Sequence, residues 1–255
     1  MDTLTPESTS GRLGGGDLLR VCLRLLFLQG LLHTRGMQNL GFMYALAPAL
    51  ARLERPEDKA LLAKHLDFFN CNPNFASLVL GGVLRLEEER LAGKAVTAED
   101  IAYFKRSVSS PLAAMGDLLF LGSLKPLALT LACVFAIYNS FIGLVATWLL
   151  YNIIVISCRL WGVHFGYTRG WELVDVFSGP AFQRLLSLVQ IIGATAGGAL
   201  VAVVLYHQSQ EGWEVLVAGV VLVTLSVSLL RRDVSSARLA ILLFPLSAVV
   251  ALLLG

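Results

Sequence analysis

Hydrophobic residues gather into long uncharged runs toward the C-terminal end of this chain. The run 185–206 has the length, roughly 20 residues, that a helix needs to cross a bilayer. Two further runs, 215–230 and 239–254, are shorter but also uncharged, and they can span when flanking residues reach the interface. The pattern predicts transmembrane helices rather than the core helices of a soluble domain.

An earlier apolar region is broken near Asn139. The part that follows the break, 141–158, predicts another spanning helix. The part that precedes it, 126–137, is too short for a secure span. We therefore interpret 126–137 as a re-entrant segment.

Basic residues predict the orientation of these runs. Residues 231–238, "RRDVSSAR", hold three arginines, whereas 207–213 holds no lysine or arginine. The connection 159–184 also contains arginines, namely Arg159, Arg169 and Arg184. Because cytoplasmic loops carry the excess of basic residues, 159–184 and 231–238 are predicted to face the cytoplasm and 207–213 the outside.

The N-terminal half alternates short apolar stretches with charged ones. Residues 54–70, "ERPEDKALLAKHLDFFN", predict an amphipathic helix. A later helix is expected to end near Gly93, and the next to begin around Thr97, where "TAED" is a capping sequence. The apolar pieces between them have the length of re-entrant hairpins, which are tolerated at membrane depth only beside protein or water and so indicate a transport pathway.

These patterns predict an all-α integral membrane protein. Amphipathic and re-entrant helices at the N-terminal side precede about 4–5 transmembrane helices. We divide the chain into a disordered leader at 1–17, an amphipathic and re-entrant region at 18–122, and a transmembrane region at 123–255. Gly193 and Gly197 form a GxxxG pair, which favours either ordinary internal packing or a contact between subunits.

Composition supports the membrane interpretation and excludes several function classes. The chain is 56% hydrophobic and 15% charged, whereas soluble domains are about a quarter charged. A net charge of +2 gives no reason to expect nucleic-acid binding. The cysteines lack metal-ligand spacing and are predicted to be buried free thiols: Cys22, Cys71, Cys133 and Cys158. P-loop, G-x-S-x-G, H-E-x-x-H and dinucleotide-binding signatures are missing, so we predict no cofactor, no metal and no catalytic residue.

Residues 32–42, "LHTRGMQNLGF", place polar side chains between apolar flanks. We interpret this stretch as a membrane-embedded hairpin, because that environment accommodates both kinds of residue. His65, on the predicted amphipathic helix, is interpreted as structural rather than catalytic. Asn152 lies inside an apolar span and is expected to form an interhelical hydrogen bond.

Five motifs occur along the chain in this order: "GMQNLGFMYALAPAL", "HLDFFNCNP", "LEEERLAG", "PLAAMGD" and "GVHFGYTRG". Over residues 18–255 the chain resembles the IID component of the mannose/fructose/sorbose family of the bacterial phosphoenolpyruvate-dependent sugar phosphotransferase system. The resemblance implies a multi-pass subunit of the inner membrane that pairs with a IIC subunit and moves a hexose-type sugar across the lipid bilayer. IIA and IIB proteins would carry the phosphoryl group, and the assembly would be a trimer of IIC–IID pairs.

The same resemblance implies sugar-site residues, namely Gln38, Asn70 and Asp117. Amides and carboxylates provide the donors and acceptors that sugar hydroxyls need. Two of these residues also have local explanations, which stay open. Asn70 can terminate the amphipathic helix, and Asp117 can cap a helix that begins at Leu118.

The chain also departs from the family pattern. Arg35 and Gly36 stand where the family has Glu-Arg, so a base replaces an acid in the substrate site, and Leu32 and His33 replace a tryptophan and an asparagine. Either the partner subunit has a compensating acid, or the substrate differs, or transport is lost. Two alternatives follow: a degenerate, membrane-docked regulatory component without sugar transport, and an unrelated membrane scaffold.

Overall fold

The computed structural model describes residues 13–53 and 65–209, and every regular element in these ranges is a helix. In chain order they are α1 (Gly15–Leu25), η1 (Leu28–Leu31), α2 (Asn39–Leu53), α4 (Ala76–Leu91), α5 (Ala98–Gly116), η2 (Asp117–Leu124), α6 (Lys125–Ile137), α7 (Phe141–Arg169), η3 (Gly170–Glu172), α8 (Leu173–Ser178) and α9 (Pro180–Ser209). The predicted helical class is therefore confirmed for this part of the chain. The first helix begins at Gly15, inside the stretch that we assigned to the leader.

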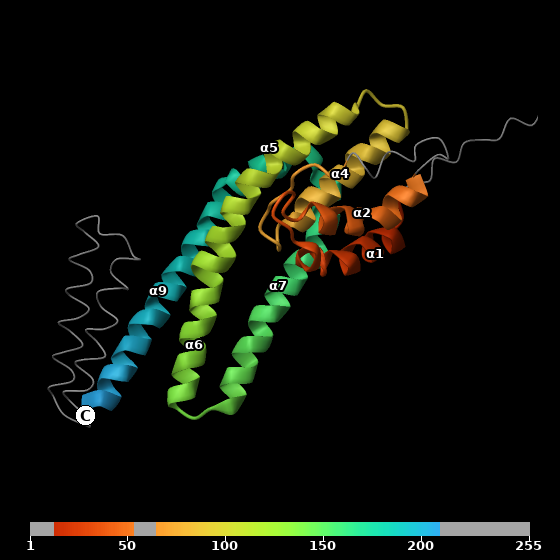
Figure 1. Cartoon of the computed structure of the whole chain (residues 1–255). Helices are drawn as coiled ribbons and strands as arrows, with labels where there is room; N and C mark the ends of the chain where they lie inside the picture. Colours follow the sequence, from red (N-terminus) through yellow and green to blue (C-terminus); the bar gives the residue numbers. More distant parts are fainter. Residues whose placement is uncertain (1–12, 54–64, 210–255) are drawn as a thin grey trace, which may run out of the picture.

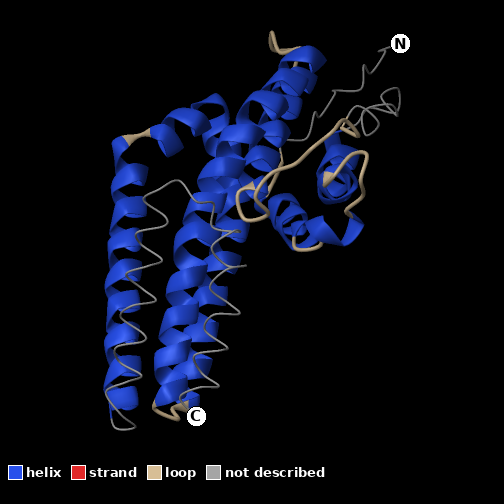
Figure 2. Cartoon of the chain, turned by 60° about the vertical axis from the view of Figure 1, so that its left-hand side comes forward, coloured by secondary structure: helices blue, strands red, loops and turns tan. Residues whose placement is uncertain are grey.

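The described helices form a head and a leg (Figure 1). The head consists of α1, α2 and α4, together with the first part of α5. The leg consists of the long helices α6, α7 and α9, which run side by side away from the head (Figure 2). Within the leg, α6 packs against both α7 and α9, and α4 joins head to leg by packing along α7.

One continuous helix links head and leg, because α5, η2 and α6 follow one another from Ala98 to Ile137. The prediction that 126–137 is a separate re-entrant segment is therefore wrong. Pro126 has no N–H, and its ring crowds the carbonyl four residues earlier. The helix accommodates Pro126 by widening into the π-helical turns of Asp117–Leu124, without ending. The boundary that we placed between residues 122 and 123 falls inside this helix.

A tight turn at residues 138–140 joins α6 to α7. Asn139 has a φ of 52°, and the Ser140 hydroxyl accepts a hydrogen bond from the Gly143 amide, at 3.3 Å. The predicted break near Asn139 is confirmed. Beyond it, α7 continues to Arg169, through residues that we assigned to a connection.

Two described stretches, Ala98–Ile137 and Phe141–Ser178, are long and apolar enough to cross a membrane. Ile142 is 83% exposed and Phe141 75% exposed, so these helices do not bury their apolar faces in a core of their own. Helix α9 covers the predicted run 185–206. The runs 215–230 and 239–254 lie outside the described residues.

Helices α4 and α7 pack at backbone contact distance. A Cβ on Gly166 would lie 2.0 Å from the Leu78 carbonyl oxygen, and one on Gly81 would lie 2.1 Å from the Val163 carbonyl oxygen. The GxxxG pair of α9 behaves differently. A Cβ on Gly193 would meet Leu127 at an ordinary 3.9 Å, and one on Gly197 would meet nothing within 4 Å.

The outcome for the predicted N-terminal elements is mixed. Gly93, with a φ of 79°, follows the end of α4, and Thr97 caps α5 in a capping box with Asp100, so both helix boundaries are confirmed. The amphipathic helix predicted for 54–70 is wrong at its end, because residues 65–70 form turns and an isolated β-bridge at Phe69. Residues 54–64 lie outside the described ranges.

We expect the substitution Gly166→Val to break the contact between α4 and α7. The added side chain meets backbone, which cannot rotate away, so unfolding should become easier by about 3 kcal/mol or more. Thermal unfolding of the purified protein measures this effect. Gly198→Val is the matched control, since a Cβ there meets nothing within 4 Å, and equal losses in the two variants would contradict the packing described above.

Candidate functional site

Two loops meet at the base of the head, next to the point where the leg begins. The first, residues 33–38, is a tight turn in which the His33 amide donates to the Met37 carbonyl at 3.1 Å and the Met37 amide donates back at 2.8 Å. The second, residues 65–75, passes beside it through the bridge between Met37 and Phe69. The predicted hairpin at 32–42 is thus a short β-like turn that leads into α2.

Gln38 joins the two loops with its side chain as well as its backbone. Its Nε2 donates to the Cys71 carbonyl at 2.9 Å, and its Oε1 accepts from the Cys71 amide at 3.0 Å. The Gln38 amide also donates to the Phe69 carbonyl at 2.9 Å. The buried side chain therefore acts like one more strand residue, which satisfies the backbone of Cys71.

A chain of polar contacts then runs from the second loop to both sides of the leg. Asn72 Nδ2 donates to Asp117 Oδ1 at 2.8 Å, and Asn72 Oδ1 accepts from the Asn74 amide at 3.0 Å. Asn74 Oδ1 accepts from Arg159 Nε on α7 at 2.8 Å. The loop is therefore tied to the π-helical segment at one end and to α7 at the other.

The structure places the predicted site residues around this loop. Gln38 and Asp117 bind the backbone of Cys71 and the side chain of Asn72, while Asn70 is exposed between Phe69 and Cys71. Asp117 does not cap a helix, because α5 continues through it, and Asn70 does not terminate one. Both local explanations are therefore wrong.

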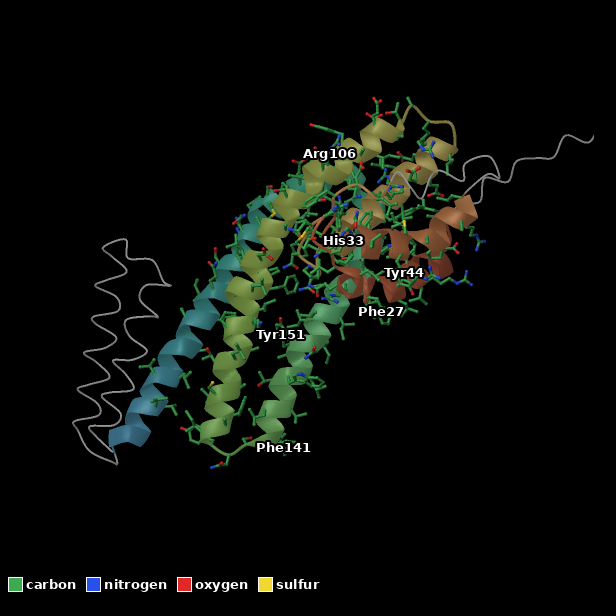
Figure 3. All side chains as sticks on the ribbon, viewed as in Figure 1. Phe27, His33, Tyr44, Arg106, Phe141 and Tyr151 are labelled. Carbon is green, nitrogen blue, oxygen red and sulfur yellow. The ribbon has the colours of Figure 1, made fainter. Side chains whose placement is uncertain are left out.

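Arg35 lies apart from these contacts. It is exposed in the tight turn, close to His33, whose position Figure 3 shows. Its charge therefore needs no buried partner in the described chain. The sugar-binding roles of Arg35, Gln38, Asn70 and Asp117 remain predictions.

One packed arrangement next to Arg35 consists of His33, Gly36 and Asn39. His33 Nε2 lies 2.8 Å from Asn39 Oδ1, and Asn39 Nδ2 donates to the Leu66 carbonyl. A Cβ on Gly36 would come within 2.2 Å of the Asn39 side chain. Any larger side chain at position 36 would displace Asn39, so Gly36 and His33 together fix the position of the Asn39 side chain.

Lys105 of α5 holds the start of the second loop in place. It is 4% exposed, and its Nζ donates to the carbonyls of His65 at 2.9 Å and Asp67 at 3.2 Å. The same ammonium lies 4.9 Å from the ring centre of Phe42 and 5.5 Å from that of Phe69. Such a cation is stabilised both by carbonyl acceptors and by ring faces.

His65 belongs to a buried structural cluster. Its Nε2 lies 3.1 Å from Glu87 Oε1, and Arg90 Nε donates to Glu87 Oε2 at 2.9 Å. Burial alone would raise the pKa of Glu87, but the hydrogen bonds and charges of His65 and Arg90 outweigh it and hold this pKa below its usual range. These contacts agree with the structural role predicted for His65.

The cysteines are free but differ in exposure. Cys22 and Cys71 are buried, and burial raises the pKa of their thiols to about 11 and about 12, so both stay protonated. Cys158 is half-buried, whereas Cys133 on α6 is exposed. The prediction of burial is therefore wrong for Cys133. Among residues 13–53 and 65–209, no three His, Cys, Asp or Glu side chains form a metal site.

A groove of about 330 Å³ lies between α6 and α7. Its lining comes from both helices: Lys125, Ala128, Leu129, Ala132, Leu144, Thr147, Trp148, Tyr151 and Asn152. Asn152 Nδ2 donates to the Trp148 carbonyl of its own helix at 2.8 Å, so the predicted interhelical bond is not formed with any residue of the described ranges. The head contains a second hollow, of about 460 Å³, where Lys94 and Arg85 pair with Glu89.

Helices of spanning length, exposed apolar faces and a polar loop at their end define a helical membrane protein. Residues 12–212 match the family described as "PTS system mannose/fructose/sorbose family IID component". The chain is 34% identical over 201 residues to the mannose-specific EIID component of Escherichia coli (strain K12), an alignment that covers 77% of this chain and 71% of the relative. It is 28% identical over 193 residues to the fructose permease IID component of Bacillus subtilis (strain 168), which covers 75% and 70%.

Solved structures agree with these sequence relatives. The mannose transporter ManYZ in complex with microcin E492 includes a chain that is 33% identical and superposes with a TM-score of 0.60, over 74% of this chain and 70% of that one. A second membrane-protein structure reaches a TM-score of 0.68 at 34% identity, over 75% and 71%. The chain therefore belongs to the IID components of the mannose/fructose/sorbose family of the sugar phosphotransferase system.

We expect Gln38→Leu to release the second loop from the first. The substitution keeps the volume of the side chain but leaves the Cys71 N–H and C=O without their partners, which should cost about 3 kcal/mol. Limited proteolysis within residues 65–75, followed by mass spectrometry, measures the release. Gln29→Leu on η1 is the matched control, because Gln29 is exposed. If residues 65–75 of Gln38→Leu resist proteolysis as well as those of the natural chain, Gln38 does not hold the second loop in place.

Proposed function

We propose that this chain is the IID subunit of a mannose-family phosphotransferase permease. It pairs with a IIC subunit and translocates a hexose-type sugar, which a IIB protein phosphorylates at the cytoplasmic side. The chain itself receives no phosphoryl group and is not an enzyme. It is a multi-pass protein of the bacterial inner membrane, and the complete assembly is a trimer of IIC–IID pairs.

The polar loop at the end of the leg is the observation that carries this proposal. Arg159, which holds Asn74, lies 18 residues beyond Phe141 on α7, a rise of about 27 Å along a helix. A bilayer's hydrocarbon core is about 30 Å thick, so the loop lies close to its boundary when the turn at 138–140 lies at the other boundary. Groups that bind a polar solute are expected where the solute enters or leaves the apolar layer.

The chemistry of the loop suits a sugar. Asn70 and the carboxylate of Asp117 are exposed, and together they offer donors and acceptors to hydroxyl groups. Gln38 acts as the support that sets the course of the loop, since both of its side-chain polar atoms already bind Cys71. Arg35, exposed in the neighbouring turn, adds a cation in place of the family's acid.

That replacement of an acid by Arg35 favours a second candidate function. A IID-like subunit whose site no longer accepts a hexose would act as a membrane-docked regulatory component. In such a protein the folded loop would persist as scaffold while sugar uptake is lost. Transport and regulation are therefore separated by a measurement of uptake, not of stability.

The test is phosphoenolpyruvate-dependent uptake of mannose-family hexoses in cells that express this chain with its cognate IIC, IIA and IIB proteins. We expect uptake by the natural chain and a loss of at least tenfold in Asn70→Ala, because the substitution removes a side chain that binds the substrate. Asn70 is exposed, so its removal should leave the protein folded. Gln29→Ala should transport like the natural chain. Failure of an assembled complex to take up any of these sugars would contradict transport, and normal uptake by Asn70→Ala would contradict the site.

A further inference from the structure

When the turn at 138–140 lies at one boundary of the bilayer, Lys125 places a cation deep in the apolar layer. It is the first residue of α6, whose 13 residues end at Ile137, so it lies about 18 Å from the turn at 138–140. In a hydrocarbon core of about 30 Å this position is just past the middle, and about 12 Å remain to the far boundary, more than a lysine side chain spans. Lys125 is exposed and forms no ion pair with another described residue.

Polar groups of α7 lie at the same level. Tyr151 is ten residues beyond Phe141, a rise of about 15 Å, and Figure 3 shows it partway between the hairpin end and the head. Tyr151 and Asn152 line the same groove as Lys125. A charge within a membrane protein almost always faces a partner or an aqueous cavity, because lipid tails offer it nothing.

The groove presents side chains that suit packing against another helix. From α6 it presents Ala128 and Ala132, one turn apart, which form the small-xxx-small pattern that lets helices approach closely. From α7 it presents Leu144, Trp148 and Tyr151, which recur at helical spacing along the facing wall. Trp148 is 64% exposed and Leu129 58% exposed, so the residues that the structure describes leave much of this apolar surface uncovered.

The carboxylate that would neutralise Lys125 is not available in this chain at that depth. Helix α6, residues 141–158 of α7, and α9 contain no aspartate or glutamate. The apolar runs 215–230 and 239–254 contain none either. Neither the C-terminal runs nor a second copy of this leg can therefore pair with Lys125 at its own level.

We propose that the groove between α6 and α7 receives a transmembrane helix of a different subunit, which carries an aspartate or glutamate opposite Lys125. The inference rests on the proposed function, in which a IIC subunit is the neighbour in the membrane. The acid forms an ion pair with the ammonium and accepts from Tyr151 or Asn152, and the alanines of α6 bring the two helices into contact. Lys125 thereby selects a partner by charge as well as by shape.

The first test compares how much IIC subunit purifies with tagged variants of the full chain. Lys125→Met keeps the length of the side chain and removes the charge, so the amount of bound IIC should fall at least tenfold. Lys125→Arg keeps the charge and should retain it. Lys94→Met is the matched control, because Lys94 lies in the head, 62% exposed and far along the chain from the groove.

The second test identifies the acid directly. A membrane-permeant carbodiimide, which is hydrated to a urea in the process, joins a carboxylate to a lysine amine as an amide. In membranes that contain the natural complex, mass spectrometry should find Lys125 linked to an aspartate or glutamate in an apolar segment of IIC. The link should be absent from Lys125→Arg, whose guanidinium does not form this amide, and that readout holds even when Lys125→Met fails to insert.

The outcomes separate this inference from the proposed function. If IIC purifies equally with the natural chain and with Lys125→Met, and Lys125 is not cross-linked, then the groove does not bind a helix of IIC. In that case only this inference is overturned. A Lys125 that snorkels to lipid headgroups would give that result. If the natural chain does not retain its IIC at all, the proposed function fails, and this inference fails with it.

Discussion

The second loop, residues 65–75, depends on hydrogen bonds that its own backbone cannot make. It is neither helix nor sheet, yet it lies near the apolar layer, where an unpaired amide costs several kcal/mol. The Gln38 side chain satisfies both polar groups of Cys71, and Asn72 and Asn74 join the loop to Asp117 and Arg159. The head, the π-helical segment and α7 are thus held in one arrangement by a few amide side chains.

These hydrogen bonds distinguish residues that hold the loop in place from residues that are free to bind a sugar. Gln38 has the composition of a sugar ligand, but its polar atoms are engaged in holding Cys71, whereas Asn70 is exposed one residue earlier. His33 and Gly36 support the same arrangement, since His33 contacts the Asn39 side chain and Gly36 leaves room for it.

The sequence predicts the helical class and several boundaries well, because uncharged length and caps such as Thr97 are local signals. Prediction from the sequence fails at positions where contacts between residues far apart in the chain determine the local conformation. Residues 65–70 leave the helical pattern because Phe69 pairs with Met37, and 126–137 belongs to a longer helix because a π-helical segment accommodates Pro126. Lys105, Asn74 and Arg159 were missed as members of the site network, since only the folded chain brings them to the loop.

The coupling between Asn72 and Asp117 is the most direct measure of whether the loop is tied to the leg. Asn72→Ala, Asp117→Ala and the double variant would be compared by thermal unfolding of the purified protein. Because each single substitution already breaks the shared hydrogen bond, the double variant should unfold close to the less stable single variant, with a coupling of about 1 kcal/mol or more. Losses that simply add would show that the two residues do not interact, and would contradict the account.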